Sequence, residues 1–453
     1  MYPPSSSASS SSGSSTWEGR GSPYQDHSSS SDRISVYSVI SEYASSYIQP
    51  QKRPFVTSKL QGVYQQPWLT DPRLKSRKRN HNAIVYTLSC IGIVVATIFC
   101  WTGSREFKSR DYCLVLDDSF KTLDPDVWNY EVQVDGFGNG QFDWTTTDPR
   151  NVFVDHNGLR IVPTLTNEST TITNDQLLNG YTLNLTRDGT CTSTLQTACG
   201  IKSSKKLGTM IPPVRSGRIN TKGKKGIRFG KVEVEAKLPS GDWLWPAIWM
   251  MPKSSAYGTW PASGEIDIME SRGNDYDTPE GGKDYFGSTL HWGPNAGADG
   301  YWRTFGTTQL KRSDFSKEFH TFGLEWTEDY LVTYVGNRIH QVMYIKFEQE
   351  GFWHRGEYAK TNATEAANPW RNAGVKQAAP FDEEFFLILN VAVGASNGYF
   401  KDSPQKPWID RSGREMQDFW KSANQWYPTW GPEETRGMTV RRVRMWQEGK
   451  CQN

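Results

Sequence analysis

Three carboxylates stand close together in the segment Gly264–Glu270, and their spacing makes them the best candidates for chemistry in the chain. Glu265 and Asp267 are two residues apart, so their side chains share one face if the segment is a β-strand. Glu270 follows Glu265 by five residues, and strict alternation would turn it into the core. One bulged residue, most simply Met269, returns it to the face of the other two acids. The sequence therefore predicts a bulged strand with three carboxylates on one side.

Two Glu side chains on such a strand can cleave a glycosidic bond. The Cα atoms of Glu265 and Glu270 are expected roughly 13–15 Å apart, at about 3.3 Å per residue. Because the side chains lean together, the gap between their carboxyls approaches the roughly 5–5.5 Å of a retaining glycosidase. Two nearby carboxylates do not both ionise freely, so one keeps the proton that acid catalysis needs. A merely solvated acidic face is the alternative, but crowded like charges destabilise a strand that has no use for them.

Composition indicates one large β domain after a non-globular start. The chain has 453 residues and a net charge of +2, which gives no reason to expect a nucleic-acid partner. Its 19 Trp are many for this length and favour flat rings that meet sugars as well as core packing. Trp245, Trp249 and Trp260 are the candidates for stacking on substrate. The first two are four residues apart and can share a strand face, although burial in the core is the ordinary fate of Trp.

Residues 1–82 read as a disordered, Ser-rich cytoplasmic tail that ends in a basic cluster next to the membrane, Arg73 to Arg79. Residues 83–102 follow as a transmembrane signal anchor. Its apolar run from Ala83 to Trp101 carries no charge and spans about 28 Å as a helix, enough to cross a hydrocarbon core. Basic residues gather on the N-terminal side, so the positive-inside rule predicts a single-pass type II membrane protein.

The remaining chain fits the luminal or extracellular side of that membrane, in the secretory pathway or at the plasma membrane. Residues 103–113 are expected to be a linker, and residues 114–453 the folded domain. Glycosylation motifs occur at Asn167, Asn184 and Asn362. Four Cys lie beyond the span and suggest disulfides in an oxidising compartment, with three pairings open: Cys113, Cys191, Cys199 and Cys451.

The folded domain is predicted to be all-β. Short strand-like runs, separated by Gly, Asn, Asp and Pro, follow one another from Leu114 onward. The segment Lys231–Lys237 alternates apolar and charged side chains, as a strand with one buried face does. Further runs are 158–162, 319–326 and 385–393. Many short strands with turn signals favour a β-sandwich or jelly roll.

Several segments resemble glycoside hydrolase family 16 in its laminarinase-type branch, and most of all its fungal membrane-anchored endo-β-1,3(4)-glucanases. That branch has the motif Glu-x-Asp-x-x-Glu, which Glu265, Asp267 and Glu270 meet, whereas the family's lichenases lack the extra residue. Other matching segments are Trp128–Asp135, Asp143–Thr147, Gly217–Thr221, Gly241–Trp249, His291–Pro294, Phe322–Trp326 and Leu389–Gly394. The likeness covers about Leu114 to Gln447. The insertion Thr166–Lys206 and the anchor lie outside the family core.

The resemblance implies a concanavalin A-like jelly roll with a curved substrate cleft. It makes Glu265 the nucleophile and Glu270 the general acid and base, while Asp267 hydrogen-bonds Glu265. It also places His291 near the acids as a substrate-binding candidate. No cofactor is implied, and a structural calcium of the family would have ligands that the sequence does not identify. Asn151, Arg218 and Asn390 lie in matching segments, but their contacts cannot be read from the sequence.

Three functions follow for a chain of this kind, with β-glucan as the partner and protein partners unknown. The first is retaining, endo-acting hydrolysis of β-1,3 or β-1,3/1,4 bonds in cell-wall glucan. The second is transglycosylation through the same intermediate, with a sugar as the acceptor. The third is a non-catalytic glucan-binding or wall-assembly protein, a reading that the three intact acids speak against. Product sizing separates the first two, and any turnover excludes the third.

Overall fold

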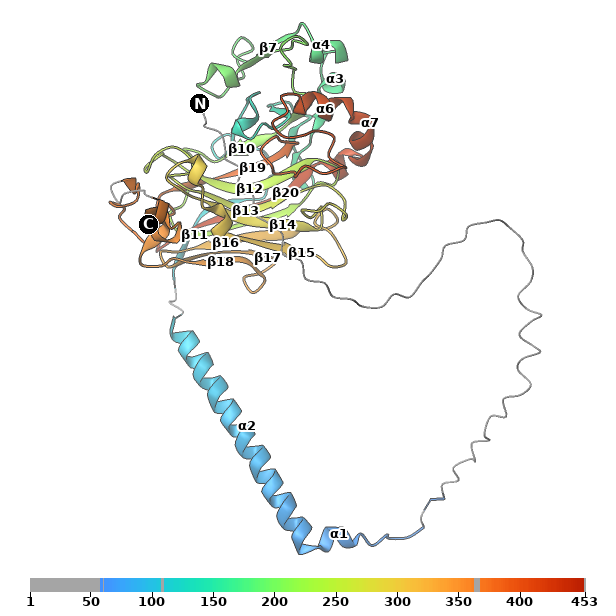
Figure 1. Ribbon diagram of the computed structural model, residues 1–453, viewed down its shortest axis with the longest axis vertical. Helices are drawn as coiled ribbons and strands as arrows, with labels where there is room; N and C mark the ends of the chain where they lie inside the picture. The colour runs from blue at the N-terminus through green and yellow to red at the C-terminus, as the bar shows by residue number, and fades with distance from the viewer. Residues whose placement is uncertain (1–57, 60, 107–109, 362–366, 452–453) are drawn as a thin grey trace, which may run out of the picture. The chain divides into compact units, whose positions relative to one another are not determined.

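The computed structural model describes residues 58–59, 61–106, 110–361 and 367–451 (Figure 1). Most of the predicted tail and the glycosylation motif at Asn362 lie outside these ranges. The chain divides into two compact units, Met1–Ser104 and Arg105–Asn453, and each is described by itself.

The first unit is mainly helical from Pro67 onward, within the residues that are described. Helix α1 spans Pro67–Thr70 and helix α2 spans Pro72–Glu106, so α2 carries both the basic cluster and the apolar run. Within the described residues, α2 is the helix whose length and composition would allow it to cross a membrane. Cys90 and Cys100 are exposed and unpaired on it. The membrane anchor itself stays a prediction, because length and composition are shared with other kinds of helix.

The second unit is a β-sandwich of two antiparallel sheets (Figure 1). The first sheet consists, in spatial order, of β18 (Gln341–Lys346), β17 (Tyr330–Val335), β16 (His320–Trp326), β11 (Gly230–Lys237), β20 (Met438–Glu448), β5 (Gly158–Ile161) and β4 (Val152–Asp155), with β1 (Tyr112–Asp118) also paired to β20. The second consists of β15 (Phe305–Gln309), β14 (Tyr285–His291), β13 (Glu265–Ser271), β12 (Leu244–Pro252), β19 (Phe385–Val393), β10 (Arg218–Asn220) and β2 (Asn129–Tyr130).

Smaller elements surround the sandwich. Three short strands form a separate sheet, β3 (Asp143–Thr145), β9 (Val214–Ser216) and β6 (Thr164–Leu165), and two more pair as β7 (Thr182–Asn184) and β8 (Gly200–Lys202). The α-helices of this unit are α3 (Thr166–Ser169), α4 (Asn174–Leu178), α5 (Gly351–Arg355), α6 (Glu415–Lys421), α7 (Ala423–Trp426) and α8 (Glu433–Arg436).

Alternating side chains explain why these segments become strands. In β11, Val232, Val234 and Ala236 are buried in the core that both large sheets share, while Glu233 and Glu235 are half-exposed. This is the pattern that the sequence predicted for Lys231–Lys237. The other predicted runs also become strands, β5, β16 and β19, with ends that differ by at most one residue. The all-β prediction is therefore confirmed.

Two disulfides close the domain and select one of the three predicted pairings. Cys113 bonds Cys451, and Cys191 bonds Cys199. Cys113 lies on β1, which begins at Tyr112. The first strand therefore starts two residues before the predicted beginning of the folded domain at residue 114. Because β1 also pairs with the last strand, the first disulfide and the sheet hold the same two chain ends together.

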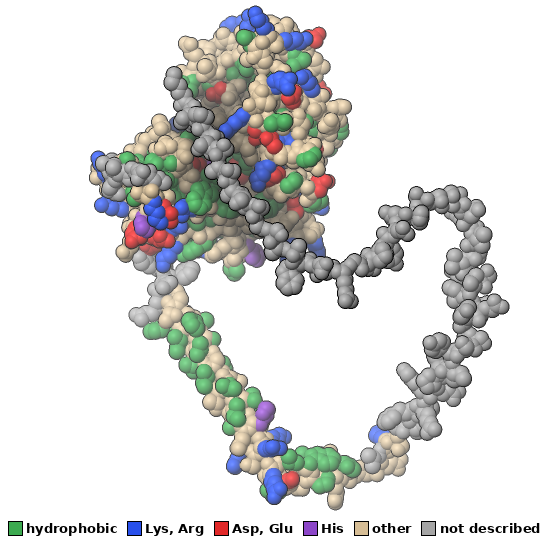
Figure 2. All heavy atoms as spheres, viewed as in Figure 1, with side chains coloured by type: hydrophobic (Ala, Val, Ile, Leu, Met, Phe, Trp, Pro, Cys, Tyr) green, Lys and Arg blue, Asp and Glu red, His purple; other side chains and the backbone are tan. Residues whose placement is uncertain are grey.

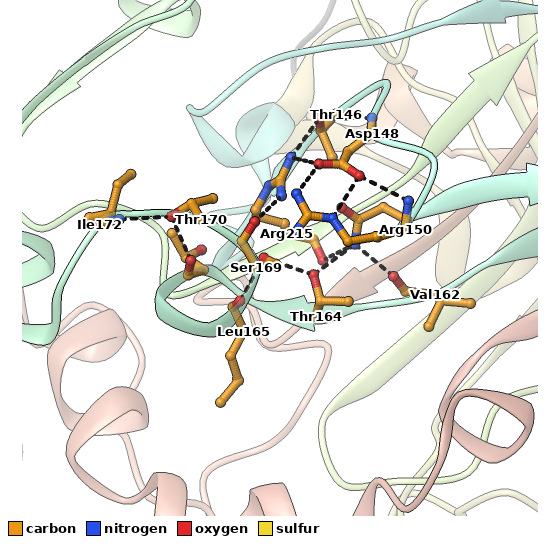
Figure 3. A network of polar contacts seen from close by, with 12 residues as sticks. Thr146, Asp148, Arg150, Val162, Thr164, Leu165, Ser169, Thr170, Ile172 and Arg215 are labelled. Carbon is orange, nitrogen blue, oxygen red and sulfur yellow. Dashed lines mark hydrogen bonds and ion pairs between the residues drawn. The ribbon is translucent and has the colours of Figure 1, made fainter.

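The insertion Thr166–Lys206 contributes Leu177 and Leu183 to a second, small hydrophobic cluster, which it shares with Val132, Trp144 and Ile211 of the domain. A polar network joins it to β9 (Figure 3). The buried guanidinium of Arg215 donates to the Ser169 carbonyl at 3.1 Å and to Asp148 Oδ2 at 2.9 Å. Hydrogen bonds from Arg150, and then from Arg215, hold the pKa of Asp148 well below its usual range. A buried guanidinium is costly unless it is paired, so this network fixes the insertion in place.

Candidate active site

Strand β13 carries the three acids and has the bulge that their spacing requires. Its register shifts between Asp267 and Glu270 against both neighbouring strands. Against β12, Met269 pairs with Ile248, and Ile268 is the residue without a partner. Against β14, both Ile268 and Met269 lack a partner, so the prediction of Met269 agrees with the β14 ladder but not with the β12 ladder. Ile268 and Met269 are both fully buried. The extra residue thus adds one apolar side chain to the core and returns Glu270 to the opposite face.

Glu265 lies at the start of β13 beside an exposed aromatic ring. Trp260 Nε1 donates a hydrogen bond to Glu265 Oε2 at 2.6 Å. The Trp260 ring is 41 % exposed and its centroid lies 5.6 Å from that of His291. It also lines a pocket of about 150 Å³ at this end of the strand. An exposed ring next to a carboxylate can stack on a sugar, as was predicted for Trp260.

Glu270 lies near the other end of β13 beside a buried aromatic stack. Trp245 Nε1 donates to Glu270 Oε1 at 2.9 Å. The Trp245 ring is only 6 % exposed and stacks on Tyr399, with centroids 3.8 Å apart and planes at 7°. Little of this ring can therefore meet a sugar, and its contacts support a role in holding Glu270. Burial, and then the charge of Glu265, raise the pKa of Glu270, although His291 and Trp245 oppose them.

Asp267 lies between the two Glu residues and is nearly inaccessible, with 2 % of its surface exposed. Burial and the charges of Glu270 and Glu265 raise its pKa well above the usual range. A hydrogen bond with Glu265 acts in the same direction, which makes protonated Asp267 the donor and Glu265 the acceptor. This is the arrangement that the resemblance implied for these two residues.

His291 brings a positive charge to the three acids. It pairs with Glu265 across the β13–β14 ladder, and its Nδ1 donates to Asp299 Oδ2 at 2.6 Å. Its Nε2 lies 3.4 Å from Asp267 Oδ2. Burial alone would lower the pKa of His291, but the bond to Asp299 and the charges of Glu265, Asp299 and Glu270 raise it to about 9. The imidazolium therefore persists at neutral pH.

Glu265, Asp267 and His291 also offer three ligand atoms within 4.8 Å of one another, as a metal site would. An ion would have to compete there with the proton that the raised pKa of His291 favours. We therefore assign no ion to this cluster, and a structural calcium elsewhere stays a prediction.

The acid-bearing face continues across the sheet on the β12 side. Trp249 is half-buried, donates from Nε1 to Asn390 Oδ1 at 2.7 Å and has the Arg218 guanidinium 4.7 Å from its ring. In the sheet register, Arg218 lies opposite Asn390, Asn390 opposite Ala247, and Ala247 opposite Glu270. These side chains thus form a line that crosses the strands. Asn151, by contrast, is buried and donates to the Val162 carbonyl at 2.8 Å, which is a structural contact.

Three residues of the site were missed by the sequence analysis: Asp299, Tyr399 and Arg272. Asp299 orients His291, and Tyr399 stacks under Trp245, with the Arg272 guanidinium 4.1 Å from the Tyr399 ring. Arg272 stands two residues after Glu270, where its charge could have been noticed. Asp299 and Tyr399 lie in loops without a motif, so only the fold brings them to the acids.

Comparison with known proteins places this chain in a family. The family model of the glycosyl hydrolases family 16 matches residues 162–376. A beta-1,3-glucan-binding protein from Penaeus monodon is 38 % identical over 346 residues, which cover 74 % of this chain and 90 % of that protein. Glucan endo-1,3-beta-glucosidase A1 from Niallia circulans is 31 % identical, over 62 % of this chain and 34 % of its own length. The laminarinase catalytic domain from Thermotoga petrophila RKU-1 is 25 % identical over 76 % of this chain and all of that domain, with a TM-score of 0.45.

Proposed function

The chain belongs to glycosyl hydrolase family 16, and on that premise we propose that it is a retaining, endo-acting β-glucan hydrolase. Its substrate is cell-wall glucan, in which it cleaves β-1,3 or β-1,3/1,4 glucosidic bonds. The observation that carries the proposal is the bulged strand β13, which presents Glu265 and Glu270 on one face in unlike surroundings. The bulge also favours the laminarinase-type branch of the family.

In the first step, Glu265 attacks the anomeric carbon and Glu270 gives its proton to the leaving oxygen. The glycosidic C–O bond breaks, and a glycosyl ester forms on Glu265. Burial raises the pKa of Glu270, so this group holds the required proton. Glu265 accepts hydrogen bonds from Trp260 and Asp267, which fix its rotamer for in-line attack.

In the second step, Glu270 acts as the base. It takes a proton from water, the water oxygen attacks the anomeric carbon, and the bond to Glu265 breaks. Two inversions retain the configuration of the sugar. The His291 imidazolium lies beside the acids throughout and offsets the negative charge that returns to Glu265 when the ester breaks.

The test is product sizing with full-length protein in detergent. Linear β-1,3, β-1,3/1,4 and β-1,6 glucans are supplied separately, and shorter products of mixed size from the first two would support endo-hydrolysis. Products longer than the substrate would identify a transglycosylase instead, because a sugar hydroxyl would then have replaced water. Absence of cleavage in all three glucans would contradict both.

A non-catalytic glucan-binding protein is the second candidate, and one observation favours it. The relative from Penaeus monodon, which this chain matches over most of its length, bears the name of a glucan-binding protein. Both candidates share the sugar-facing surface around Trp260 and Trp249. They differ in turnover, so binding of laminari-oligosaccharides without any product would decide for the binding protein.

We also propose that a type II membrane anchor holds the folded domain on the luminal or extracellular side of the membrane. The apolar helix α2 and the two disulfides support this placement. Protease protection in sealed membranes tests it. The domain should be protected and the N-terminal tail digested, and the reverse pattern would overturn the topology.

A further inference from the structure

A second, larger pocket opens beyond the Glu270 end of β13. Its volume is about 500 Å³, against about 150 Å³ for the pocket beside Trp260. The loop before β12, the loop after β13 and the segment 401–405 form most of its wall, and Thr429 completes it. Its lining includes Asp242, Trp243, Asn274, Asp277, Ser403 and Gln405. The proposed mechanism uses none of these residues.

The pocket lies beside the path of a bound glucan. A retaining enzyme holds the scissile bond between its two carboxyls. Glu265 and Glu270 stand on one strand, so a glucan that passes between them must cross β13 rather than follow it. The line of side chains that ends at Arg218 crosses the strands in the same direction. Because the pocket lies further along β13, past Glu270, it is flanking space that the main chain does not fill.

The lining also carries charges of both signs, Asp275, Glu280, Lys283 and Lys401, and Lys283 pairs with Asp275 at 3.2 Å. Such a mixture of donors and acceptors suits a neutral, hydroxyl-rich ligand. Asp242 and Asp277 are hydrogen-bond acceptors for hydroxyl groups, and Gln405 can both donate and accept. Bonds to ionised carboxylates are among the stronger hydrogen bonds. The volume falls within the range of roughly 300–1,000 Å³ that small-molecule sites occupy. Hexose units meet these requirements of size and polarity.

The wall of the pocket is held in place before any ligand arrives. Trp243 has a φ of 66°, a left-handed conformation that is uncommon for a large side chain. It is fixed by its N–H, which donates to Asn274 Oδ1 at 3.0 Å. Gly241 N donates to Gly273 O at 2.9 Å, and a Cβ on Gly273 would stand 2.4 Å from the Gly241 carbonyl oxygen. A preformed wall lowers the entropy cost of binding.

The pocket is also joined to the support of Glu270. Trp245, which donates to Glu270, stacks on Tyr399, and Arg272 covers the other side of this stack. Arg272 Nη1 then donates to the carbonyl of Glu280, a residue of the pocket lining, at 3.2 Å. The pocket is thus anchored to the groups that hold the general acid.

We propose that this pocket binds a hexosyl side branch of the glucan, so that the protein recognises branched β-glucan. The inference rests on the proposed function in that its ligand is a β-glucan. It adds a specificity site that lies outside the path of the main chain. A branch carried on a primary hydroxyl has one more rotatable bond than a ring linkage, which lets it leave the main chain at an angle.

The test compares a linear β-1,3-oligosaccharide with the same oligosaccharide carrying one 1,6-linked glucosyl branch, using full-length protein in detergent. Ser403→Trp fills the pocket and should lower the ratio of kcat/KM values, branched over linear, by about tenfold. Asp277→Ala removes an exposed acceptor and should lower the ratio in the same direction by about threefold. The control Ser412→Trp adds the same bulk at an exposed position outside the lining and should leave the ratio unchanged.

Binding to the Glu265→Gln protein provides a readout without turnover. Calorimetry should give a tighter Kd for the branched than for the linear ligand, and Ser403→Trp in that background should abolish the difference. Equal affinities, or losses that affect linear and branched ligands alike, would overturn the inference. If the natural protein binds both ligands but cleaves neither, the hydrolase proposal fails, while the affinity ratio still decides whether the pocket binds the branch.

Discussion

The two ends of strand β13 hold the same kind of side chain in opposite surroundings. At the Glu265 end, Trp260 is 41 % exposed and His291 brings a positive charge next to the carboxylate. At the Glu270 end, the partner Trp245 is 6 % exposed within an aromatic stack, and burial raises the pKa of the acid. Both Glu residues accept a hydrogen bond from an indole. The two Glu residues therefore differ in exposure and charge rather than in residue type, and the roles that we propose for them, nucleophile and acid, rest on that difference.

The same contrast extends to the two pockets. An exposed aromatic ring borders the small pocket beside Glu265, whereas the larger one beyond Glu270 is lined mainly by carboxylates, amides and two lysines, with the buried Trp243 as its aromatic residue. Aromatic faces suit the apolar face of a sugar ring, and carboxylates suit its hydroxyls. The asymmetry of one strand thus sets both the chemistry and the recognition that we propose.

Replacing the acids has the largest expected effect. Glu265→Gln and Glu270→Gln should each lower kcat/KM for linear β-1,3-glucan by at least about 10³-fold. With an aryl glycoside, whose phenolate leaves without a proton, Glu270→Gln should recover the first step, seen as a burst of phenol. Glu265→Gln should not recover it. The exposed Glu318→Gln is the matched control, and turnover of either substrate by Glu265→Gln would refute its role as nucleophile.

The next largest effects are expected from removing the hydrogen bonds that the indoles of Trp245 and Trp260 donate to the two Glu residues. Because the bond from Trp245 lowers the pKa of Glu270, Trp245→Phe should raise that pKa and move the alkaline limb of the kcat/KM profile to higher pH. The rate at the optimum should fall about tenfold. Trp260→Phe removes the bond to Glu265 and should cost a similar factor without moving that limb. If both variants shift the alkaline limb equally, the two ends do not differ as we describe.

The charge on His291 predicts a pH dependence of stability. Its pKa is raised from 6.5 to about 9, so the folded state favours the proton. The resulting stabilisation is fully present below pH 6.5 and is lost as the pH rises through about 9. Melting temperature, measured by calorimetry, should fall over this interval, and Asp299→Asn should flatten the fall. The exposed His354→Gln should change nothing, and an unchanged slope for Asp299→Asn would contradict the role of Asp299.

The smallest effect on activity is expected for a substitution away from both ends of β13, in the network of Arg215 and Asp148. Arg215→Met removes the buried partner of Asp148 and should destabilise the domain by about 3 kcal/mol in urea unfolding. The double variant with Asp148→Asn should cost less than the sum of the single changes, because the two groups share a network. The kcat/KM of the folded protein should stay within about twofold, since the hydrogen bonds described for Arg215 go to Thr146, Asp148 and Ser169 and not to the acids. A large loss would show that the insertion shapes the site.

Local sequence determined the parts of the site that one strand can encode. The spacing of Glu265, Asp267 and Glu270 implied a bulge, and the structure has it at Ile268 and Met269. Alternation of apolar and charged residues predicted β11, and short strand-like runs between turn residues predicted β5, β16 and β19. Backbone periodicity needs no knowledge of distant partners, and side-chain burial follows from it.

Tertiary structure decided everything that depends on distant segments. Tyr399 reaches the site from far along the chain, where its hydroxyl donates to the Ser271 carbonyl at 3.0 Å and its ring stacks on the buried donor Trp245. Asp299 fixes the proton on His291 from a loop that carries no motif. The large pocket likewise needs three segments at once. The sequence by itself determined which acids could react, and long-range packing set their protonation and surroundings, because burial and charge are properties of the assembled fold.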